Sequence, residues 1–145
     1  MLDEFYATAP AGFPDDPHRG FETVTYMMSG ACQHEDFCGH RGIISTGDLQ
    51  SPVYTRTQTM YLDFTMQPGS MMEQAIPPGW NAFVYILSGK ALFGPKGNQT
   101  EGLSHHALVL THEVDGLQVE NKSKEACQFV LIGGEPINEP VVSYF

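Results

Sequence analysis

The amino-acid sequence predicts an all-β protein built as a sandwich or a barrel. Runs rich in Val, Ile, Thr, Tyr and Phe alternate with short segments that contain Gly and Pro, and no stretch has the period of an amphipathic helix. Several short antiparallel strands without helices favour an architecture that limits its exposed sheet edges. An internal repeat further indicates that one structural unit is used twice.

Five runs are predicted to form strands, namely residues 22–28, 60–66, 81–88, 106–111 and 128–134. Turn sequences lie where hairpins need them: Ser29-Gly30, Gln67-Pro68-Gly69, Ser88-Gly89, Lys96-Gly97-Asn98 and Asp115-Gly116. Trp80 directly precedes the third run, and its aromatic surroundings alternate as in a buried strand. We therefore expect it to pack in the core.

The internal repeat aligns residues 20–30 with residues 79–89 at a constant offset of 59. Glycine, tyrosine, serine and glycine recur at matching places, with an aromatic residue after the first glycine in both copies. Each copy is predicted to be a strand that is entered from a tight turn and left through a Ser-Gly hairpin. Two related barrels, or one barrel and part of another, would produce this pattern.

Length and charge limit the classes of function. The 145 residues are 41% hydrophobic, which suffices for one compact domain or two very small ones. Seventeen acidic against seven basic residues give a formal net charge of −10, which opposes direct nucleic-acid binding. The sequence has no signal-peptide pattern and no apolar run near the roughly 20 residues that span a bilayer. We expect a soluble intracellular protein whose three cysteines are reduced.

Asp16 and His18 are candidate metal ligands. Non-haem Fe(II) sites typically combine two imidazoles with one carboxylate, and this pair offers one of each. Their i, i+2 spacing in an extended segment would point both side chains to the same side. The repeat places Ala75 and Pro77 at the equivalent positions, so any such site belongs to the first copy. The alternative is that Asp15 and Asp16 begin a turn that leaves His18 exposed.

A second constellation consists of Cys32-x-His34 and Cys38-x-His40, which are residue types that zinc accepts. The alternative is a polar strand and turn with incidental cysteines. The adjacent pair His105-His106 is interpreted as the start of a strand, where neighbouring residues face opposite sides. No nucleophile elbow and no phosphate-binding glycine pattern is found.

The order of several blocks resembles the pirin family over nearly the whole chain. These blocks are PHRGFETVTYMMSG, HEDFCGH, GDLQ, VYTRTQTMYLDF, PPGWNAFVYILSG and VLIGGEPINEPVV. The resemblance implies two cupin domains, each a double-stranded β-helix or jelly-roll barrel, with one non-haem iron in the N-terminal cupin. It also implies a nuclear and cytoplasmic transcriptional co-regulator that acts through protein partners, and in some members a quercetin dioxygenase activity.

The chain departs from the family pattern at the iron site. The family uses a His-x-His pair before GFET and a later His and Glu after GDLQ, whereas here Asp16 replaces the first histidine and His18 is the second. The later pair is absent, because the chain passes from Gln50 directly into a block that belongs to the second cupin. A segment on the order of half a domain is missing. We therefore expect iron to be bound weakly or not at all.

The predicted organisation is a partial N-terminal pirin cupin over residues 1–50 and a nearly complete C-terminal cupin over residues 51–145. A third iron ligand within the chain would have to come from His34, Glu35 or His40, without the surrounding residues that orient ligands.

Three functions remain open. The first is a pirin-like regulatory protein that binds transcription or signalling factors and needs no intact metal site. The second is an iron-dependent enzyme similar to quercetin 2,3-dioxygenase; the incomplete site argues against it, and the question of enzymatic activity stays open. The third is a truncated product without activity, which a splice variant, a shortened paralogue or a faulty gene model would yield.

Overall fold

The computed structural model describes residues 4–12, 24–35, 39, 41–50, 57–111 and 115–139. In this part of the chain every regular element is a β-strand, as predicted, and no helix is long and apolar enough to cross a membrane. Residue contacts divide the chain into a first unit, Met1–Thr55, and a second unit, Arg56–Phe145. Each unit is described by itself.

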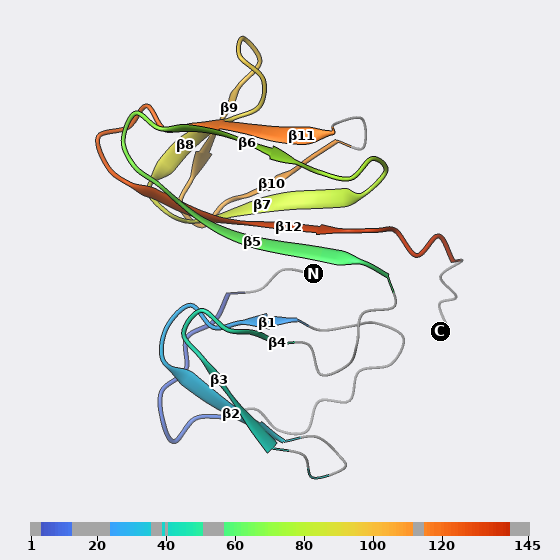
Figure 1. The fold of residues 1–145 in the computed structure, drawn as a ribbon. Helices are drawn as coiled ribbons and strands as arrows, with labels where there is room; N and C mark the ends of the chain where they lie inside the picture. The colour runs from blue at the N-terminus through green and yellow to red at the C-terminus, as the bar shows by residue number, and fades with distance from the viewer. Residues whose placement is uncertain are drawn as a thin grey trace, which may run out of the picture. The chain divides into compact units, whose positions relative to one another are not determined.

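The second unit contains two four-stranded antiparallel sheets, which Figure 1 shows as two layers. The sheet that we call the β7 sheet has the order β10-β7-β12-β5 and comprises β5 (Thr59–Met66), β7 (Asn81–Ser88), β10 (Ala107–Val109) and β12 (Cys127–Gly134). The β11 sheet has the order β6-β11-β8-β9 and comprises β6 (Met71–Ala75), β8 (Lys90–Phe93), β9 (Thr100–Leu103) and β11 (Gly116–Glu120).

The core of the second unit fills the space between these sheets. Alternate residues of each strand point inward, and on β12 the inward residues Cys127, Phe129 and Leu131 are fully buried. The Phe129 ring lies 5.1 Å from that of Phe64 and 5.2 Å from that of Phe93, centroid to centroid. Trp80 packs partly buried against the same cluster, as predicted. Apolar burial of this kind is the main stabilising term of a small domain.

Among the described residues of the second unit, Asn121 is a polar residue that is buried as a whole. Asn121 is completely buried directly after β11, and its Nδ2 donates hydrogen bonds to the carbonyl oxygens of Met66, at 3.0 Å, and Glu125, at 2.9 Å. Its Oδ1 accepts from the backbone N–H and the hydroxyl of Ser123. Because both amide hydrogens and the amide oxygen are paired, these hydrogen bonds offset the desolvation cost of burying Asn121, which fixes the connection between β11 and β12.

The first unit contains two short strand pairs. β1 (Thr25–Tyr26) pairs with β4 (Leu49–Gln50), and β2 (Ala31–Glu35) pairs with β3 (Arg41–Ser45). Ile44 is the one buried hydrophobic residue among the described residues of this unit. The strand predicted over residues 22–28 is thus reduced to two residues within the described part.

The two copies of the internal sequence repeat have the same strand connectivity. Strands β1, β2, β3 and β4 connect in the same way as β7, β8, β9 and β10, since in both copies the outer two strands pair and the inner two form a hairpin. Gly30 and Gly89 end the two repeat segments, and both have a positive φ, 85° and 72°. Only glycine adopts this conformation without strain, so the same turn chemistry is used twice.

The difference between the copies lies in the flanking strands. In the second unit, β5 and β12 extend the β7–β10 pair to four strands, and β6 and β11 extend the β8–β9 hairpin. At the offset of 59, counterparts of β11 and β12 would fall at residues 57–75. Those residues instead form β5 and β6 of the second unit.

Candidate functional site

Only some of the predicted metal ligands lie among the residues that the structure describes. Asp16, His18, Cys38 and His40 lie outside the described residues, so their assignment stays a prediction. Within the part of the chain that is described, no group of three or more His, Cys, Asp or Glu residues could hold a metal ion.

Cys32 and His34 lie on one face of β2, because residues two apart in a strand face the same side. Both are half-buried, whereas Gln33 and Glu35 on the other face are exposed. Glu35 forms an ion pair with Arg41, with 3.0 Å between Oε2 and Nε. This carboxylate therefore lies on the face opposite His34 and cannot share a metal with it from within β2.

The His34 ring is placed by a glycine. His34 lies opposite Gly42 in the β2–β3 register, and a side chain at position 42 would collide with the Nε2 atom of the imidazole. This nitrogen is buried and has no hydrogen-bond partner in the described part of the chain. The Cys32 thiol contacts the Gln33 carbonyl oxygen at 3.6 Å. The hairpin thus places a thiol and an imidazole on one face, fewer than the three or four protein ligands that iron or zinc sites normally have.

The interior of the second unit does not fit a metal ion. A metal inside the barrel needs donors that point inward, but the buried core positions of the described strands carry apolar side chains: Met66, Ala82, Val84, Ile86, Ala91, Phe93, Leu117, Val119, Phe129 and Leu131. Cys127 is the exception, and burial raises the pKa of its thiol, which opposes formation of the thiolate that binds metals. The interior of the second unit is thus a packed apolar core.

The two adjacent histidines lie in a turn. His105 has a φ of 63°, and the strand that follows, β10, begins at Ala107. The expectation that they open the strand was wrong by one residue, because the Leu103–His106 backbone hydrogen bond closes a turn first. The Nδ1 atom of His106 lies 2.9 Å from the carbonyl oxygen of Ser104.

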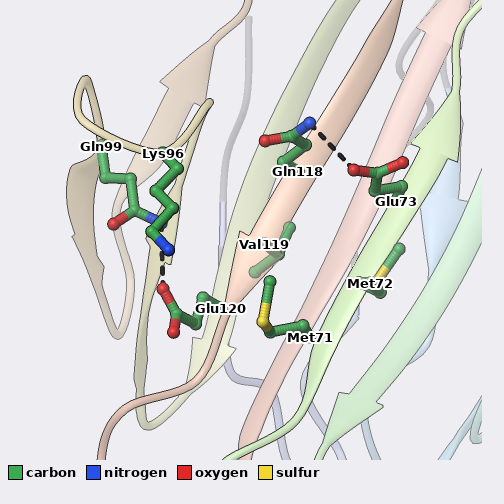
Figure 2. A pocket seen from close by; sticks show the side chains of 8 residues that line it. All are labelled: Met71, Met72, Glu73, Lys96, Gln99, Gln118, Val119 and Glu120. Atoms are coloured by element: carbon green, nitrogen blue, oxygen red, sulfur yellow. Dashed lines mark hydrogen bonds between the residues drawn. The ribbon is translucent and has the colours of Figure 1, made fainter.

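A shallow pocket of about 320 Å³ lies on the outer face of the β11 sheet. Figure 2 shows that β6 and β11 supply its floor, while the loop between β8 and β9 supplies Lys96 and Gln99 on one side. The eight lining residues are Met71, Met72, Glu73, Lys96, Gln99, Gln118, Val119 and Glu120. The Met71 side chain is 72% exposed and forms an apolar spot among polar groups.

The carboxylates of this pocket are held by neighbours. Gln118 Nε2 donates to Glu73 at 2.9 Å across the β6–β11 register. The side chain of Lys122 lies 2.8 Å from Glu120, and together with a hydrogen bond from Gln99 it lowers the pKa of that carboxyl group. Both carboxylates of the pocket are therefore engaged by neighbouring side chains.

The sequence did not indicate this pocket. Its residues come from three separate segments, around Met71, Lys96 and Glu120, and only the β6–β11 pairing and the β8–β9 loop bring them together. The sequence of β6, MMEQA, has no apolar-polar alternation that would have predicted this strand.

Each of the two units matches a protein-family profile. The sequence profile described as pirin C-terminal cupin domain matches residues 61–145, and the profile described as pirin matches residues 3–53. The chain belongs to the pirin family. Its fold is therefore the cupin fold that the resemblance implied.

Relatives in plants and animals are similar over nearly all of this chain. A pirin-like protein of Solanum lycopersicum is 41% identical over 213 aligned residues, covering 99% of this chain and 72% of the relative. Pirin of Homo sapiens is 36% identical over 214 residues, covering 99% of this chain and 73% of the relative. Both alignments are longer than the 145 residues of this chain, so they include positions that only the relative occupies.

Solved structures share the fold at low sequence identity. A protein from Geobacillus kaustophilus superposes with a TM-score of 0.75 at 22% identity, covering 86% of this chain and 78% of that one. Quercetin 2,3-dioxygenase from Acinetobacter baumannii superposes with a TM-score of 0.70 at 17% identity, covering 88% and 69%. At these identities the likeness concerns the fold alone.

Proposed function

We propose that this pirin-family chain is a regulatory protein that acts in the nucleus and cytoplasm by binding protein partners such as transcription or signalling factors. The apolar packing of the second unit's interior carries this proposal, because it leaves the outer surface as the place where this unit can recognise a ligand. Direct nucleic-acid binding is not part of the proposed function, since the net charge of −10 would repel phosphates.

The proposed first cupin, residues 1–50, is incomplete and its iron site is degraded. Asp16 and His18 are the proposed remnant ligands, and iron is bound weakly or not at all. Two observations support this reading: residues 57–75 serve the second unit where counterparts of β11 and β12 would fall, and relatives occupy aligned positions that this chain lacks. Residues 51–145 form the proposed C-terminal cupin, which carries the function.

The pocket on the β11 sheet is the proposed contact point for a partner. Met71 offers an exposed apolar surface, and Glu73 and Lys96 offer charge on either side of it. A partner segment that covers the methionine and pairs with these charges would bury apolar area at the centre and leave polar contacts at the rim, as protein interfaces commonly do.

Elemental analysis of the purified full chain tests the metal part of the proposal. Protein expressed in iron-supplemented medium should contain substoichiometric iron, and His18→Ala should contain the same amount. Oxygen consumption with quercetin should stay at the level of a protein-free control. Stoichiometric iron that disappears in His18→Ala, together with oxygen uptake, would instead establish the enzyme that resembles quercetin 2,3-dioxygenase.

Proximity labelling in cells tests the regulatory part. The full chain should label a reproducible set of nuclear and cytoplasmic proteins, and Met71→Glu should lose members of that set. Ile137→Glu is the matched control, because Ile137 is also an exposed apolar residue of the second unit, 49% exposed, but does not line the pocket. Equal labelling by both variants would remove the pocket from the proposal, and labelling no different from an unfused enzyme would remove the regulatory role.

A further inference from the structure

The edge strand β6 leaves one side of its backbone open. It forms the border of the β11 sheet, and in the described part of the chain β11 is the strand that pairs with it. Just beyond β6, the Ile76 N–H donates to the Asp115 carbonyl oxygen at 2.9 Å. Just before it, the Ser70 carbonyl oxygen accepts from the Asn121 N–H at 2.9 Å. Because antiparallel strands bond at every second residue, the backbone groups of β6 that face β11 are those of its even-numbered residues.

Met71, Glu73 and Ala75 consequently turn their N–H and C=O groups away from β11. Their side chains are exposed, and Met71 is 72% exposed. Gln74 Nε2 donates to the Ala75 carbonyl oxygen at 2.9 Å, and within the described residues no other hydrogen bond engages these outward backbone groups. Such a row of unpaired groups is a template for an extended chain.

Glu73 gives this open edge a negative charge. It is the charged residue of β6 and lies at the middle of the strand. Figure 2 shows its hydrogen bond from Gln118, whose Nε2 donates to Oε1 at 2.9 Å. None of the ion pairs among the described residues includes Glu73, whereas Glu120 is paired with Lys122. A carboxylate without a neutralising cation therefore lies beside the exposed apolar Met71.

The charge of this edge decides which kind of molecule fits it. Symmetric pairing with a second copy, about an axis at the centre of β6, would place Glu73 opposite itself, and like charges in opposite positions are destabilising. Two chains that each carry a net charge of −10 also repel each other. A basic extended segment of another protein meets neither obstacle and gains from the opposite charge.

We propose that β6 binds a basic extended segment of a partner protein as an added antiparallel strand, with a lysine or arginine opposite Glu73 and apolar residues opposite Met71 and Ala75. The inference rests on the proposed function, because it states how the partner at the pocket is held. Backbone hydrogen bonds to the outward groups of β6 supply affinity, and the alternate side chains supply specificity.

A synthetic peptide tests this edge site in vitro. It is blocked at both ends and has a central lysine, a valine two positions to either side and threonine elsewhere. NMR of the isotope-labelled full chain at low salt should show saturable shifts, largest at the amides of residues 71–75. N-methylation of the lysine and the valines removes the N–H groups that would face β6 and should abolish the shifts. N-methylation of the threonines, whose N–H groups would face away, should preserve them.

Two substitutions test the charge and the backbone separately. Glu73→Lys should weaken binding of the lysine peptide on the order of tenfold, and should strengthen binding of a peptide with a central glutamate. Ala75→Pro removes one outward N–H without touching the bonds to β11 and should weaken both peptides, whereas Ala75→Ser keeps that N–H and should bind normally. Thermal unfolding confirms that the variants fold. Equal binding by the two methylated peptides, shifts centred on another strand, or no binding would overturn the proposal.

Proximity labelling with the same variants separates this inference from the proposed function. Ala75→Pro should lose the same labelled partners as Met71→Glu, while Ala75→Ser should keep them. Partners lost by Met71→Glu but kept by Ala75→Pro would overturn strand addition and leave the proposed function standing. Peptide binding at β6 without any labelled partner would support the edge site and remove the proposed function.

Discussion

The two copies of the repeat differ in what surrounds them. In the second copy the eight-residue strand β7 lies between β10 and β12, and the β8–β9 hairpin is extended by β11 and β6. In the first copy the equivalent strand, β1, has two residues and, among the described residues, pairs with β4. Both copies nevertheless turn through a left-handed glycine into a hairpin. The eight-residue strand is thus the one whose described neighbours pair with it on both sides.

The difference has an energetic counterpart. The second copy contributes Val84, Ile86 and Phe93 to a shared core, whereas Ile44 is the single buried hydrophobic residue in the described part of the first unit. Two-stranded ribbons without a hydrophobic face are marginal in water. Substitutions at matched places in the two units should thus have unequal effects on unfolding.

The largest inequality is expected from core truncation. Phe129→Ala removes a fully buried ring that contacts Phe64 and Phe93, and should lower the free energy of unfolding by about 3–5 kcal/mol. Ile44→Ala should leave the transition of the second unit unchanged. Urea unfolding followed by Trp80 fluorescence measures both, since Trp80 is the single tryptophan and lies in the second unit. A shift of that transition by Ile44→Ala would mean that the units unfold together.

The buried asparagine should come next. Asn121→Ala leaves the carbonyl oxygens of Met66 and Glu125 without their side-chain donor and opens a small cavity, so we expect a loss of about 2–4 kcal/mol in the same assay. Ser123→Ala is the matched control and should cost less, because it removes one half-buried hydroxyl from the same network. Equal losses would show that the hydroxyl, rather than the buried amide, fixes the loop.

Gly30 and Gly89, which occupy matching places in the two copies, should differ less in their effect on stability. A side chain at Gly89 would meet the backbone carbonyl of Ala126, whereas one at Gly30 would meet no atom within 4 Å. Gly30→Ala should therefore cost about 1 kcal/mol from its positive φ, and Gly89→Ala about 2–3 kcal/mol, because the clash adds to this strain. Hydrogen exchange of the two hairpins would measure these losses. A larger effect at Gly30 would show that the first hairpin is packed against something.

The last contrast concerns the reactivity of the two described cysteine thiols. Cys127 is fully buried and burial raises the pKa of its thiol, whereas Cys32 is partly exposed. Iodoacetamide followed by peptide mass spectrometry should label Cys32 in the native protein and Cys127 only after unfolding. Rapid labelling of native Cys127 would contradict its place in the core.

The raised pKa also sets a pH dependence. The unfolded thiol ionises near the ordinary cysteine value of about 8.5, while burial raises the pKa of the folded Cys127 thiol, which therefore stays protonated to higher pH. Its contribution to stability is therefore complete below that value and declines as the pH rises further. Cys127→Ala should remove this part of the alkaline decline, which urea unfolding at several pH values would detect.

The sequence predicted the long strands well and the short ones poorly. β5, β7 and β12 have continuous runs of apolar and β-branched residues, and each matched its predicted run within one residue at either end. β6 and β11 were missed, since MMEQA and GLQVE contain polar residues and become strands through lateral pairing. The same pairing creates the pocket, which no local pattern could reveal. Asp16 and His18 lie outside the described residues, so that site stays a prediction.

Hydrogen exchange over the whole chain tests the contrast between the units most directly. Peptides that cover β5, β7 and β12 should exchange only through global unfolding, while peptides that cover β2 and β3 should exchange orders of magnitude faster, since few buried contacts hold them. Such a result would establish a complete second cupin beside an incomplete first one. Equal protection of β2 and β12 would contradict this account.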